Sequence, residues 1–482
     1  MATFNLELRR LSFLFCKQKR CNFYFLKRIF KLSLILFNER AYFHFLVSSR
    51  FAPSRQRRTL SRFEKRRASS THFDTNILDN LEERNDARVM FLHDTILELQ
   101  TELEKLGSTL QVFYGKPIEV FTELIKTENV QTVYTNKDYE PYALKRDAEI
   151  EKILSEKQIL FHKFKDQVIF EDSEVVKDDG LPYTVFSPYA KKWRAKLLTQ
   201  TEQTNGEWGS CFFKGYPTEE YFSHFVQRAP DKIISLEKMN FSRSAIKIPS
   251  RTVAQKIIKS YDATRNFPAD EHGTSRLGIH FRFGTISIRE KARAAEKLNE
   301  TFLNELIWRD FYSSILQHFP RVAIGDAFRP EYEKIDWIND EKQLRAWQEG
   351  KTGYPIVDAG MRQLNATGYM HNRVRMIVSS FLTKHLLINW RFGEAYFAKK
   401  LLDFDLASNS GGWQWAAGCG TDAAPYFRVF NPTAQQEKFD AQNIYVKRWV
   451  KEFGTENYPK PIVEHTFARN RCLETYAKAL KK

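Results

Sequence analysis

The spacing of apolar residues between about residues 73 and 168 predicts short strands that alternate with helices. Residues 93–106 carry apolar side chains at helical intervals, and residues 110–114 form a mostly apolar run that a Gly-Lys-Pro turn ends. A second helix is predicted over 118–126 and a second strand over 130–134. The apolar positions of the first helix are Ile96, Leu97, Leu99, Leu103 and Leu106. This alternation predicts an α/β domain built on a parallel sheet.

The rest of the chain follows other patterns. From about Thr252 onward, apolar residues recur at helical spacing between Gly and Pro breaks, which predicts a mostly α-helical domain over 251–475. Residues 170–250 contain few periodic stretches and are interpreted as an interdomain connector. The α/β domain is therefore expected over 73–169, and no internal repeat is found.

Residues 1–72 match neither pattern. They contain no glycine, one proline, many Phe and Arg residues and no sustained hydrophobic period. An Arg-rich, acid-poor composition is typical of an organellar transit peptide. The alternative, which we prefer, is that the start of the chain was assigned wrongly or translated out of frame.

The net charge of +16 suggests a nucleic-acid partner, but its distribution weakens that inference. Residues 1–72 hold 17 Lys and Arg against three acidic residues, a net charge of +14, which leaves +2 for the other 410 residues. No apolar run approaches the roughly 20 residues that span a bilayer. Five cysteines without a CxxC pair argue against a disulfide framework and against a zinc site. We expect a soluble protein of a reducing compartment, cytoplasmic rather than organellar, with no metal.

One predicted helical face combines an acid, an indole, a guanidinium and a phenol. These side chains recur at positions i, i+3, i+4 and i+7 and are Glu305, Trp308, Arg309 and Tyr312. A second face is apolar and contains Leu303, Ile307, Phe311 and Ile315. A buried ion pair beside core aromatics would explain the first face by itself.

Similar groups recur further along the chain. Asn372, Arg375 and Met376 share one helical face, and Asp405 precedes Asn409 by one turn. The run 411–415 (Gly-Gly-Trp-Gln-Trp) follows, and its glycines would let the large indoles approach another group closely. Core packing alone explains this concentration of groups poorly.

The segment 273–278 (Gly-Thr-Ser-Arg-Leu-Gly) predicts a turn that enters a helix. Its amides and hydroxyls could bind phosphate, although an ordinary helix cap has the same composition. Other catalytic motifs are absent: the sequence contains no GxGxxG after a strand, no HExxH and no GxSxG. Residues 350–352 imitate the end of a P-loop, but Arg345 stands where its first glycine is required.

Taken together, the segments 273–278, 304–312, 350–376 and 403–432 resemble the photolyase/cryptochrome family in order and spacing. The resemblance is closest to class I cyclobutane pyrimidine dimer photolyases, and it covers roughly residues 73–475. It implies an N-terminal α/β domain that can hold an antenna chromophore, followed by a helical domain that binds FAD.

The resemblance also assigns cofactor residues. The ribityl and phosphate groups of FAD would be held by Tyr261, Thr274, Ser275, Leu277 and Gly278. The adenine and isoalloxazine would be surrounded by Asn372, Arg375, Asp403, Asp405 and Asn409, with Arg309 facing the same cofactor. Asn409 would face flavin N5, and Arg375 with Asp403 would lie against the ring. The active flavin is the reduced anion, which a nearby guanidinium stabilises.

The implied substrate is a pyrimidine dimer flipped out of damaged DNA. Glu305 would hydrogen-bond the thymine edge while Trp308 and Trp415 sandwich the dimer, and Asn372 and Met376 would line the pocket. The residues implied to bind phosphates, for which solvated surface charge is the alternative, are Arg265, Arg373, Arg428 and Lys438. The tryptophans implied to reduce the flavin in light, for which core packing is the alternative, are Trp337, Trp390 and Trp413.

The expected function is light-driven dimer repair by electron transfer from excited reduced FAD. Asn409 matches repair enzymes of the family, and Asn372 and Met376 stand where (6-4) photolyases have histidines. A cryptochrome-type photoreceptor without repair activity is the alternative, and a non-catalytic DNA-binding protein is a third. A monomer that binds damaged DNA and no membrane is expected.

The chain departs from the family before about Phe73. The opening strand of the family is not recognisable there, so we infer that the first strand, first helix and second strand of the sheet are missing or replaced. An incomplete parallel sheet would expose apolar edges. We predict a damaged antenna domain, low solubility, or both. The antenna itself stays open: a folate is the commonest, but Ala143 lies near where an acidic folate contact is expected.

Overall fold

A five-stranded sheet forms near the N-terminus in the computed structural model, which describes residues 35–36, 67–202 and 225–481. The strands are β1 (Ile35–Leu36), β2 (Arg67–Asp74), β3 (Leu110–Gly115), β4 (Thr132–Asn136) and β5 (Leu160–Phe164). Their order is β3-β2-β1-β4-β5. β2 pairs in parallel with β3, and β4 with β5, whereas β1 is antiparallel to both of its neighbours. The predicted parallel pairing is confirmed.

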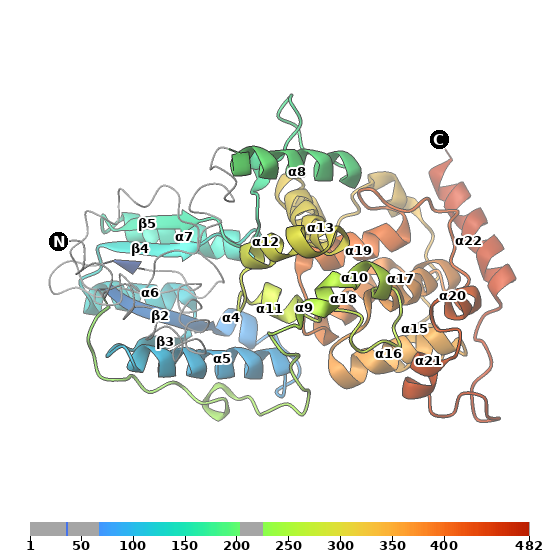
Figure 1. Ribbon diagram of the computed structural model, residues 1–482, viewed down its shortest axis with the longest axis horizontal. Coiled ribbons are helices and arrows are strands. Elements are labelled where there is room, and N and C mark those ends of the chain that lie inside the picture. Colours follow the sequence, from blue (N-terminus) through green and yellow to red (C-terminus); the bar gives the residue numbers. More distant parts are fainter. Residues whose placement is uncertain (1–34, 37–66, 203–224, 482) are drawn as a thin grey trace, which may run out of the picture.

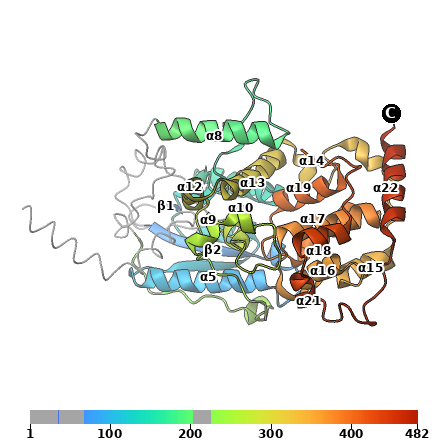
Figure 2. The same cartoon turned by 45° about the vertical axis from the view of Figure 1, so that its right-hand side comes forward.

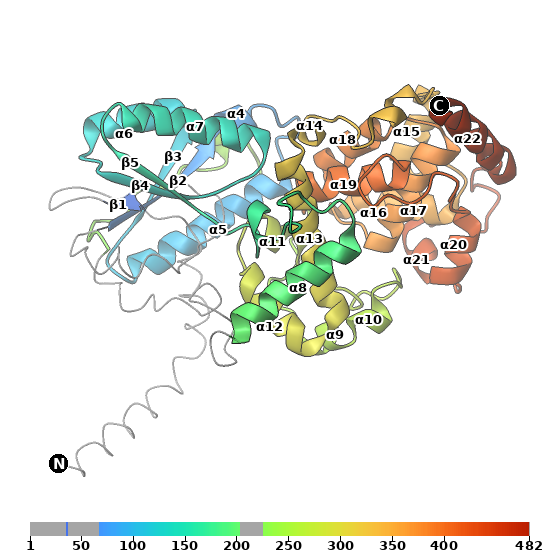
Figure 3. The ribbon, with the colours of Figure 1, turned by 90° about the horizontal axis from the view of Figure 1, so that it is seen from above.

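Helices cover both faces of this sheet (Figure 3). The helices are α4 (Thr75–Leu78), α5 (Ala87–Glu104), α6 (Pro117–Thr127) and α7 (Pro141–Ser155). Helices α6 and α7 lie on one face, and α5 lies on the other. The helices predicted over 93–106 and 118–126 correspond to α5 and α6, and the predicted strands correspond to β3 and β4.

The second strand of the sheet was inferred to be missing or replaced, and the first of these alternatives is wrong, because β2 is present. β2 runs parallel to β3 from Ser69 opposite Leu110 to Asp74 opposite Gly115. Its sequence is polar, yet Ser69, Ser70 and Thr71 are buried, so a hydrophobic pattern could not reveal it. The described sheet therefore includes Arg67, which lies inside the segment set apart as atypical. Among the described residues only the two-residue β1 lies between β2 and β4; the expectations for 1–34 and 37–66 lie outside the described residues.

The C-terminal half is helical and lies beside the sheet domain (Figure 1). Its helices are α9 (Gln255–Lys259), α10 (Tyr261–Thr264), α11 (Gly278–Arg282), α12 (Ile288–Leu298), α13 (Glu300–His318), α14 (Pro320–Ala323), α15 (Glu341–Glu349), α16 (Pro355–Thr367), α17 (Asn372–Ser380), the π-helix η5 (Phe381–His385), α18 (Trp390–Lys400), α19 (Leu406–Ala417), α20 (Pro432–Phe439), α21 (Ile444–Trp449) and α22 (His465–Leu480). Short 3₁₀ turns are η1 (Asp172–Glu174), η3 (Glu237–Met239) and η4 (Pro330–Lys334).

The region predicted as a connector contains helix α8 (Phe186–Glu202), which lies over α12 and α13 (Figure 2). Asp310 of α13 accepts hydrogen bonds from the backbone N–H groups of Ile169 and Phe170 and from Nε1 of Trp193 in α8. All four residues are buried. The connector is therefore part of the helical core in this stretch.

The two domains meet in apolar and polar contacts. The ring of Phe91 in α5 lies 5.5 Å from that of His280 and 5.9 Å from that of Phe283. Arg88 donates to the carbonyl of Ala398 at 2.8 Å, and Lys400 pairs with Glu83. Residues of both domains can therefore contribute to one site. None of the helices in the described part of the chain has the length and apolar character needed to cross a membrane.

Candidate functional site

Helix α13 has the two faces that the sequence predicts. Leu303, Ile307 and Phe311 are buried, whereas Glu305 and Trp308 are half-buried. Asn299 fixes the start of the helix, because its side chain accepts the N–H of Phe302 at 3.1 Å. An acid and an indole are therefore held side by side where a ligand can reach them.

Glu305 forms an ion pair with Arg265. Burial raises the pKa of the Glu305 carboxyl, although Arg265 opposes that shift. The guanidinium of Arg265 also lies 5.4 Å from the centre of the Tyr261 ring. The structure thus joins Arg265, predicted to bind phosphate, to Glu305, predicted to bind thymine.

Trp308 is stacked on Phe186, the first residue of α8. The ring centres are 3.7 Å apart and the planes differ by 4°. The backbone N–H of Phe186 donates to Asp422 at 3.2 Å, which fixes the start of α8 there. One face of the Trp308 indole is therefore covered, and a base can stack only on the other face.

Trp415 is half-buried on α19, close to α13. Gly411 lets these helices approach: a Cβ at this position would lie 2.3 Å from Cδ1 of Tyr312. Gly412 has open space around it. The interpretation that both glycines admit the large indoles therefore needs correction, because Gly411 makes room for Tyr312.

Arg375 of α17 and Asp403 form the predicted pair. Nη2 of Arg375 lies 2.9 and 3.1 Å from the two carboxylate oxygens, and its Nε donates to the carbonyl of Met370. Gly278 lies against the same carboxylate, since a Cβ there would be 2.5 Å from Oδ2 of Asp403. The turn 273–278 and the segment before α19 are therefore in direct contact.

The other predicted residues of this turn are placed beside that pair. Thr274 Oγ1 lies 3.1 Å from the hydroxyl of Tyr369, and the Ser275 hydroxyl accepts the N–H of Leu277 at 3.5 Å. Leu277 is buried at the start of α11. Burial raises the pKa of Tyr261 at the start of α10. The turn precedes α11, as predicted.

Four guanidiniums surround His371, the N-cap of α17. Burial lowers the pKa of His371, and the charges of Arg375, Arg373, Arg276 and Arg265 lower it further, to about 4. Nε of Arg276 is buried without a hydrogen-bond partner among the described residues, and so is Nε2 of His371. Arg276 also has a positive φ of 49°. Glu305 and Asp403 balance Arg265 and Arg375, so the positive charge that an anionic ligand would balance is that of Arg276 and Arg373.

Acid is expected to destabilise this region through His371. The side chain accepts the N–H of Arg373 only while it is neutral, and the unfolded chain protonates near pH 6.5. Stability is therefore complete above about pH 6.5 and falls as the pH drops towards 4, by about 3 kcal/mol. Urea unfolding at pH 7.5 and 4.5 measures the loss. The H371N variant, which keeps a capping acceptor, should lose less; an equal loss in both chains would contradict this account.

Asn409 of α19 is buried beside Glu394 of α18. Its Nδ2 donates to Oε1 of Glu394 at 2.7 Å and to the backbone carbonyl at 3.1 Å. Burial raises the pKa of Glu394, and the bond from Asn409 opposes that shift. Because the amide nitrogen is engaged, the orientation of the amide is fixed with its oxygen directed elsewhere.

The three predicted electron-transfer tryptophans belong to one core cluster. Trp413 and Trp390 are buried, and Trp337 is partly buried against the same cluster. Trp337 lies 6.0 Å from Tyr476, ring centre to ring centre. Trp347, which the sequence analysis did not single out, is fully buried 6.0 Å from Trp413. These contacts also fit the alternative that the tryptophans only pack the core, so their role in electron transfer stays a prediction.

Two of the four predicted DNA-binding residues meet on one ring. The Arg373 guanidinium lies 4.4 Å, and the Lys438 ammonium 5.4 Å, from the centre of the Phe439 ring. Arg373 also donates to Asn266, the neighbour of Arg265, at 2.7 Å. Arg428 is exposed, but no contact joins its side chain to this group. Arg265, Arg373 and Lys438, which we call the basic surface, are therefore linked through Asn266 and Phe439.

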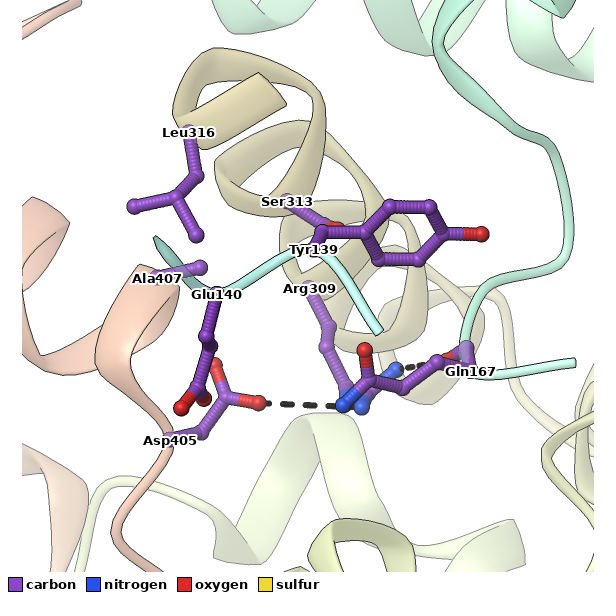
Figure 4. A pocket seen from close by; sticks show the side chains of 8 residues that line it. All are labelled: Tyr139, Glu140, Gln167, Arg309, Ser313, Leu316, Asp405 and Ala407. Atoms are coloured by element: carbon purple, nitrogen blue, oxygen red, sulfur yellow. Dashed lines mark hydrogen bonds and ion pairs between the residues drawn. The ribbon is translucent and has the colours of Figure 1, made fainter. Parts of the chain in front are cut away.

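A small cavity separates the sheet domain from α13 and α19 (Figure 4). Inside it, Arg309 contacts Asp405 at 3.7 Å and donates to the carbonyl of Gln167. Burial raises the pKa of Glu140 to about 7, although Arg282 opposes that shift. The lining residues are Tyr139, Glu140, Gln167, Arg309, Ser313, Leu316, Asp405 and Ala407. The predicted cofactor residues Arg309 and Asp405 thus come together, next to residues of the other domain.

Sequence reasoning missed three residues of this region. Phe186 and Glu140 lie more than one hundred residues along the chain from Trp308 and Arg282, which they contact, and Glu394 lies on the helix before that of Asn409. Their local sequences give no sign of these contacts. Only the folded arrangement brings them to the site.

Two family models match the chain. The model described as the FAD binding domain of DNA photolyase matches residues 302–455, and the model described as DNA photolyase matches residues 70–205. The deoxyribodipyrimidine photo-lyase of Synechococcus sp. is 35% identical over 428 residues, which cover 81% of this chain and 87% of that protein. The enzyme of the same name from Escherichia coli K12 is 35% identical, over 76% of this chain and 82% of its own.

Solved structures have the same fold. A class III photolyase from Agrobacterium tumefaciens superimposes with a TM-score of 0.74 at 30% identity, covering 89% of this chain and 95% of that one. A photolyase from Sulfolobus tokodaii, solved with two FAD molecules, gives 0.69 at 32% identity, covering 86% and 94%. A Synechocystis cryptochrome gives 0.71 at 23% identity over 85% and 93%, which shows the fold alone.

Proposed function

The chain belongs to the DNA photolyase family, and from this premise we propose how its residues carry out the light-driven repair of cyclobutane pyrimidine dimers in DNA. The observation that carries the function is the 35% identity to a deoxyribodipyrimidine photo-lyase over 87% of that enzyme's length. A shared fold alone would not distinguish repair from photoreception. The residues of the site therefore have to account for cofactor, lesion and electron supply.

The guanidiniums around His371 fit the anionic cofactor FAD. A pyrophosphate beside Arg276 would supply the acceptor that its buried Nε lacks among the described residues. The residues assigned to the ribityl and phosphate groups are Tyr261, Thr274, Ser275, Leu277 and Gly278. The chemistry that reduced FAD supplies when bound is light-driven donation of an electron to the dimer.

Arg375 and Asn409 would tune this cofactor. Asp403 holds the Arg375 guanidinium in place at 2.9 Å, so that its positive charge can stabilise an anionic reduced ring. Glu394 engages the amide nitrogen of Asn409, which leaves the amide oxygen to accept a ring N–H. Asn372, Asp405 and Arg309 complete the set assigned to the adenine and isoalloxazine.

The lesion would enter between the half-buried indoles of Trp308 and Trp415. Phe186 covers one face of Trp308 and already holds the indole in place. The dimer would therefore stack on the other face without a further loss of conformational entropy by the indole. Glu305, whose pKa burial raises, hydrogen-bonds the thymine edge. Asn372 and Met376 line the rest of the pocket.

Arg265, Arg373, Arg428 and Lys438 would bind the DNA backbone around the flipped dimer. Arg265 pairs with Glu305 in the structure, so phosphate binding by Arg265 and lesion binding by Glu305 each compete with this ion pair. We further propose that the protein acts as a monomer inside the cell. The Sulfolobus relative, solved with two FAD molecules, implies a light-harvesting cofactor in that protein. The identity of an antenna chromophore in this chain stays open.

A titration in the dark tests lesion recognition. A thymine-dimer oligonucleotide should bind about tenfold or more tightly than the undamaged strand of the same sequence, because a poorly stacked lesion costs less to flip. The flavin absorbance band of the purified chain is recorded in parallel. Equal affinity for both strands, or a chain without flavin, would favour a non-catalytic DNA-binding protein.

The tryptophans predicted to pass electrons to FAD give a separate prediction. W390F keeps an aromatic ring in the core but is harder to oxidise, so photoreduction of bound FAD should slow by about tenfold or more. Chemically reduced protein should repair dimers normally. W449F is the control, because Trp449 packs on the same core cluster outside the predicted chain. Equal photoreduction in W390F and W449F would remove Trp390 from the pathway.

A further inference from the structure

Helix α19 carries three of the assigned residues: Asn409 for the cofactor, Trp413 for electron transfer and Trp415 for the substrate. Asp405 is its N-cap and accepts the N–H of Ser408 at 3.0 Å. The first N–H groups of a helix have no partner within the helix and need one from outside. The position of this helix end therefore decides where the three side chains lie.

The other domain places a carboxyl group at this helix end. Glu140 shares the cavity with Asp405 and Ala407, which flank Leu406, the first residue of α19, and the Leu406 N–H opposes the rise in the pKa of Glu140 that burial causes. Glu140 is itself the N-cap residue of α7 in the sheet domain. A carboxylate at a helix N-terminus also interacts favourably with the helix dipole. The sheet domain thus places a carboxyl group beside the start of a helix in the FAD-binding domain.

Arg282 completes the contact. Its Nη2 lies 2.9 Å from Oε1 of Glu140, and both side chains are largely buried. Arg282 ends α11, the helix that begins at Gly278 against Asp403. The charges of Arg309 and Arg282 also outweigh burial and hold the pKa of Asp405 below its usual value. Two guanidiniums therefore face the carboxyl groups of Glu140 and Asp405 at the junction of the domains, and the charge of Asp138 acts on both Glu140 and Arg282.

Figure 4 shows Glu140 and Asp405 next to each other at the cavity, with Arg309 reaching towards Asp405 from α13. Removal of one member would leave a buried charge without its partner, which costs more than the pair contributes. The junction therefore has a structural reason to keep all four groups together.

We propose that Glu140, held by Arg282, is a positioning residue that fixes the start of α19, so that docking of the sheet domain sets the affinity for FAD. The proposal rests on the assignment of FAD to this site. It makes the sheet domain necessary to the cofactor site whether or not an antenna is bound. It also explains why damage to this domain would lower FAD content.

The test compares E140A, R282A, the double variant and E83Q. FAD affinity is measured by the fluorescence of released flavin, and the surroundings of Trp413 and Trp415 by near-ultraviolet circular dichroism. E140A should bind FAD about tenfold or more weakly and alter the tryptophan signal. The double variant should be no weaker than E140A, because the two residues act as one unit. E83Q removes an exposed interdomain pair away from α19 and should match the wild type.

E140Q keeps the side-chain volume and an oxygen for the Leu406 N–H, so it serves if E140A fails to fold. It should bind FAD more weakly than the wild type and more tightly than E140A. Wild-type affinity and an unchanged tryptophan signal in E140A or E140Q would overturn the proposal, while repair by the wild type would still stand. A wild type that holds FAD but repairs no dimer would contradict the function and leave the affinity comparison intact.

Discussion

Replacing Trp308 by alanine is expected to weaken the binding of dimer-containing DNA by about 5- to 150-fold, since a base–aromatic stack contributes about 1–3 kcal/mol. Phe186 holds the indole plane with its ring 3.7 Å away, so the stacking face is already oriented before the lesion arrives. The loss should be confined to the lesion. Undamaged DNA, which meets the basic surface rather than the pocket, should bind W308A and the wild type alike.

The matched control is W308F, which keeps an aromatic face against Phe186. It should recover most of the lost affinity for the dimer. Fluorescence anisotropy with labelled dimer and undamaged oligonucleotides in the dark measures the dissociation constants of the wild type, W308A and W308F for both. Equal losses for both oligonucleotides in W308A would mean that the indole supports the fold or the general DNA surface instead of the lesion.

The second large effect is on stability, and it is expected for D310A. The Asp310 carboxylate is fully buried and accepts two backbone N–H groups and the Trp193 indole N–H. Alanine would leave three buried donors without an acceptor, at a cost of about 3–5 kcal/mol. The helical domain should therefore unfold at a clearly lower urea concentration, followed by tryptophan fluorescence.

D310N is the control, because it keeps one acceptor oxygen and the size of the side chain. It should lose less stability than D310A. Loss of α8 from the core before the rest of the domain unfolds would also fit this account. D310A with wild-type stability would show that water replaces the carboxylate and that α8 does not depend on it.

Local patterns predicted the regular elements well where the apolar spacing was strong. The strand at 110–114 and the helix at 118–126 have clear periods and were found close to their places. β2 was missed because three of its buried residues, Ser69, Ser70 and Thr71, are polar and give no hydrophobic pattern, although Phe73 is buried too. Helix α8 was missed because what holds it, Asp310, lies more than one hundred residues further along the chain.

The site was predictable to the extent that its groups share a helix or a known motif. The faces of α13 and the pair of Arg375 with Asp403 follow from spacing and resemblance. The partners of these groups do not, since Glu394 and Phe186 come from other elements. Gly411 shows the same limit. The sequence suggested that this glycine makes room for an indole, whereas the packing of α19 on α13 places Tyr312 against it.

The central claim is that this chain splits pyrimidine dimers in light with the site formed by α13, α17 and α19. It is tested most directly by the recovery of thymine absorbance when reduced protein and a thymine-dimer oligonucleotide are exposed to blue light, against a dark control. The account predicts recovery in the light only. Protein with a normal FAD spectrum that binds the dimer oligonucleotide, yet gives no recovery in the light, would contradict it.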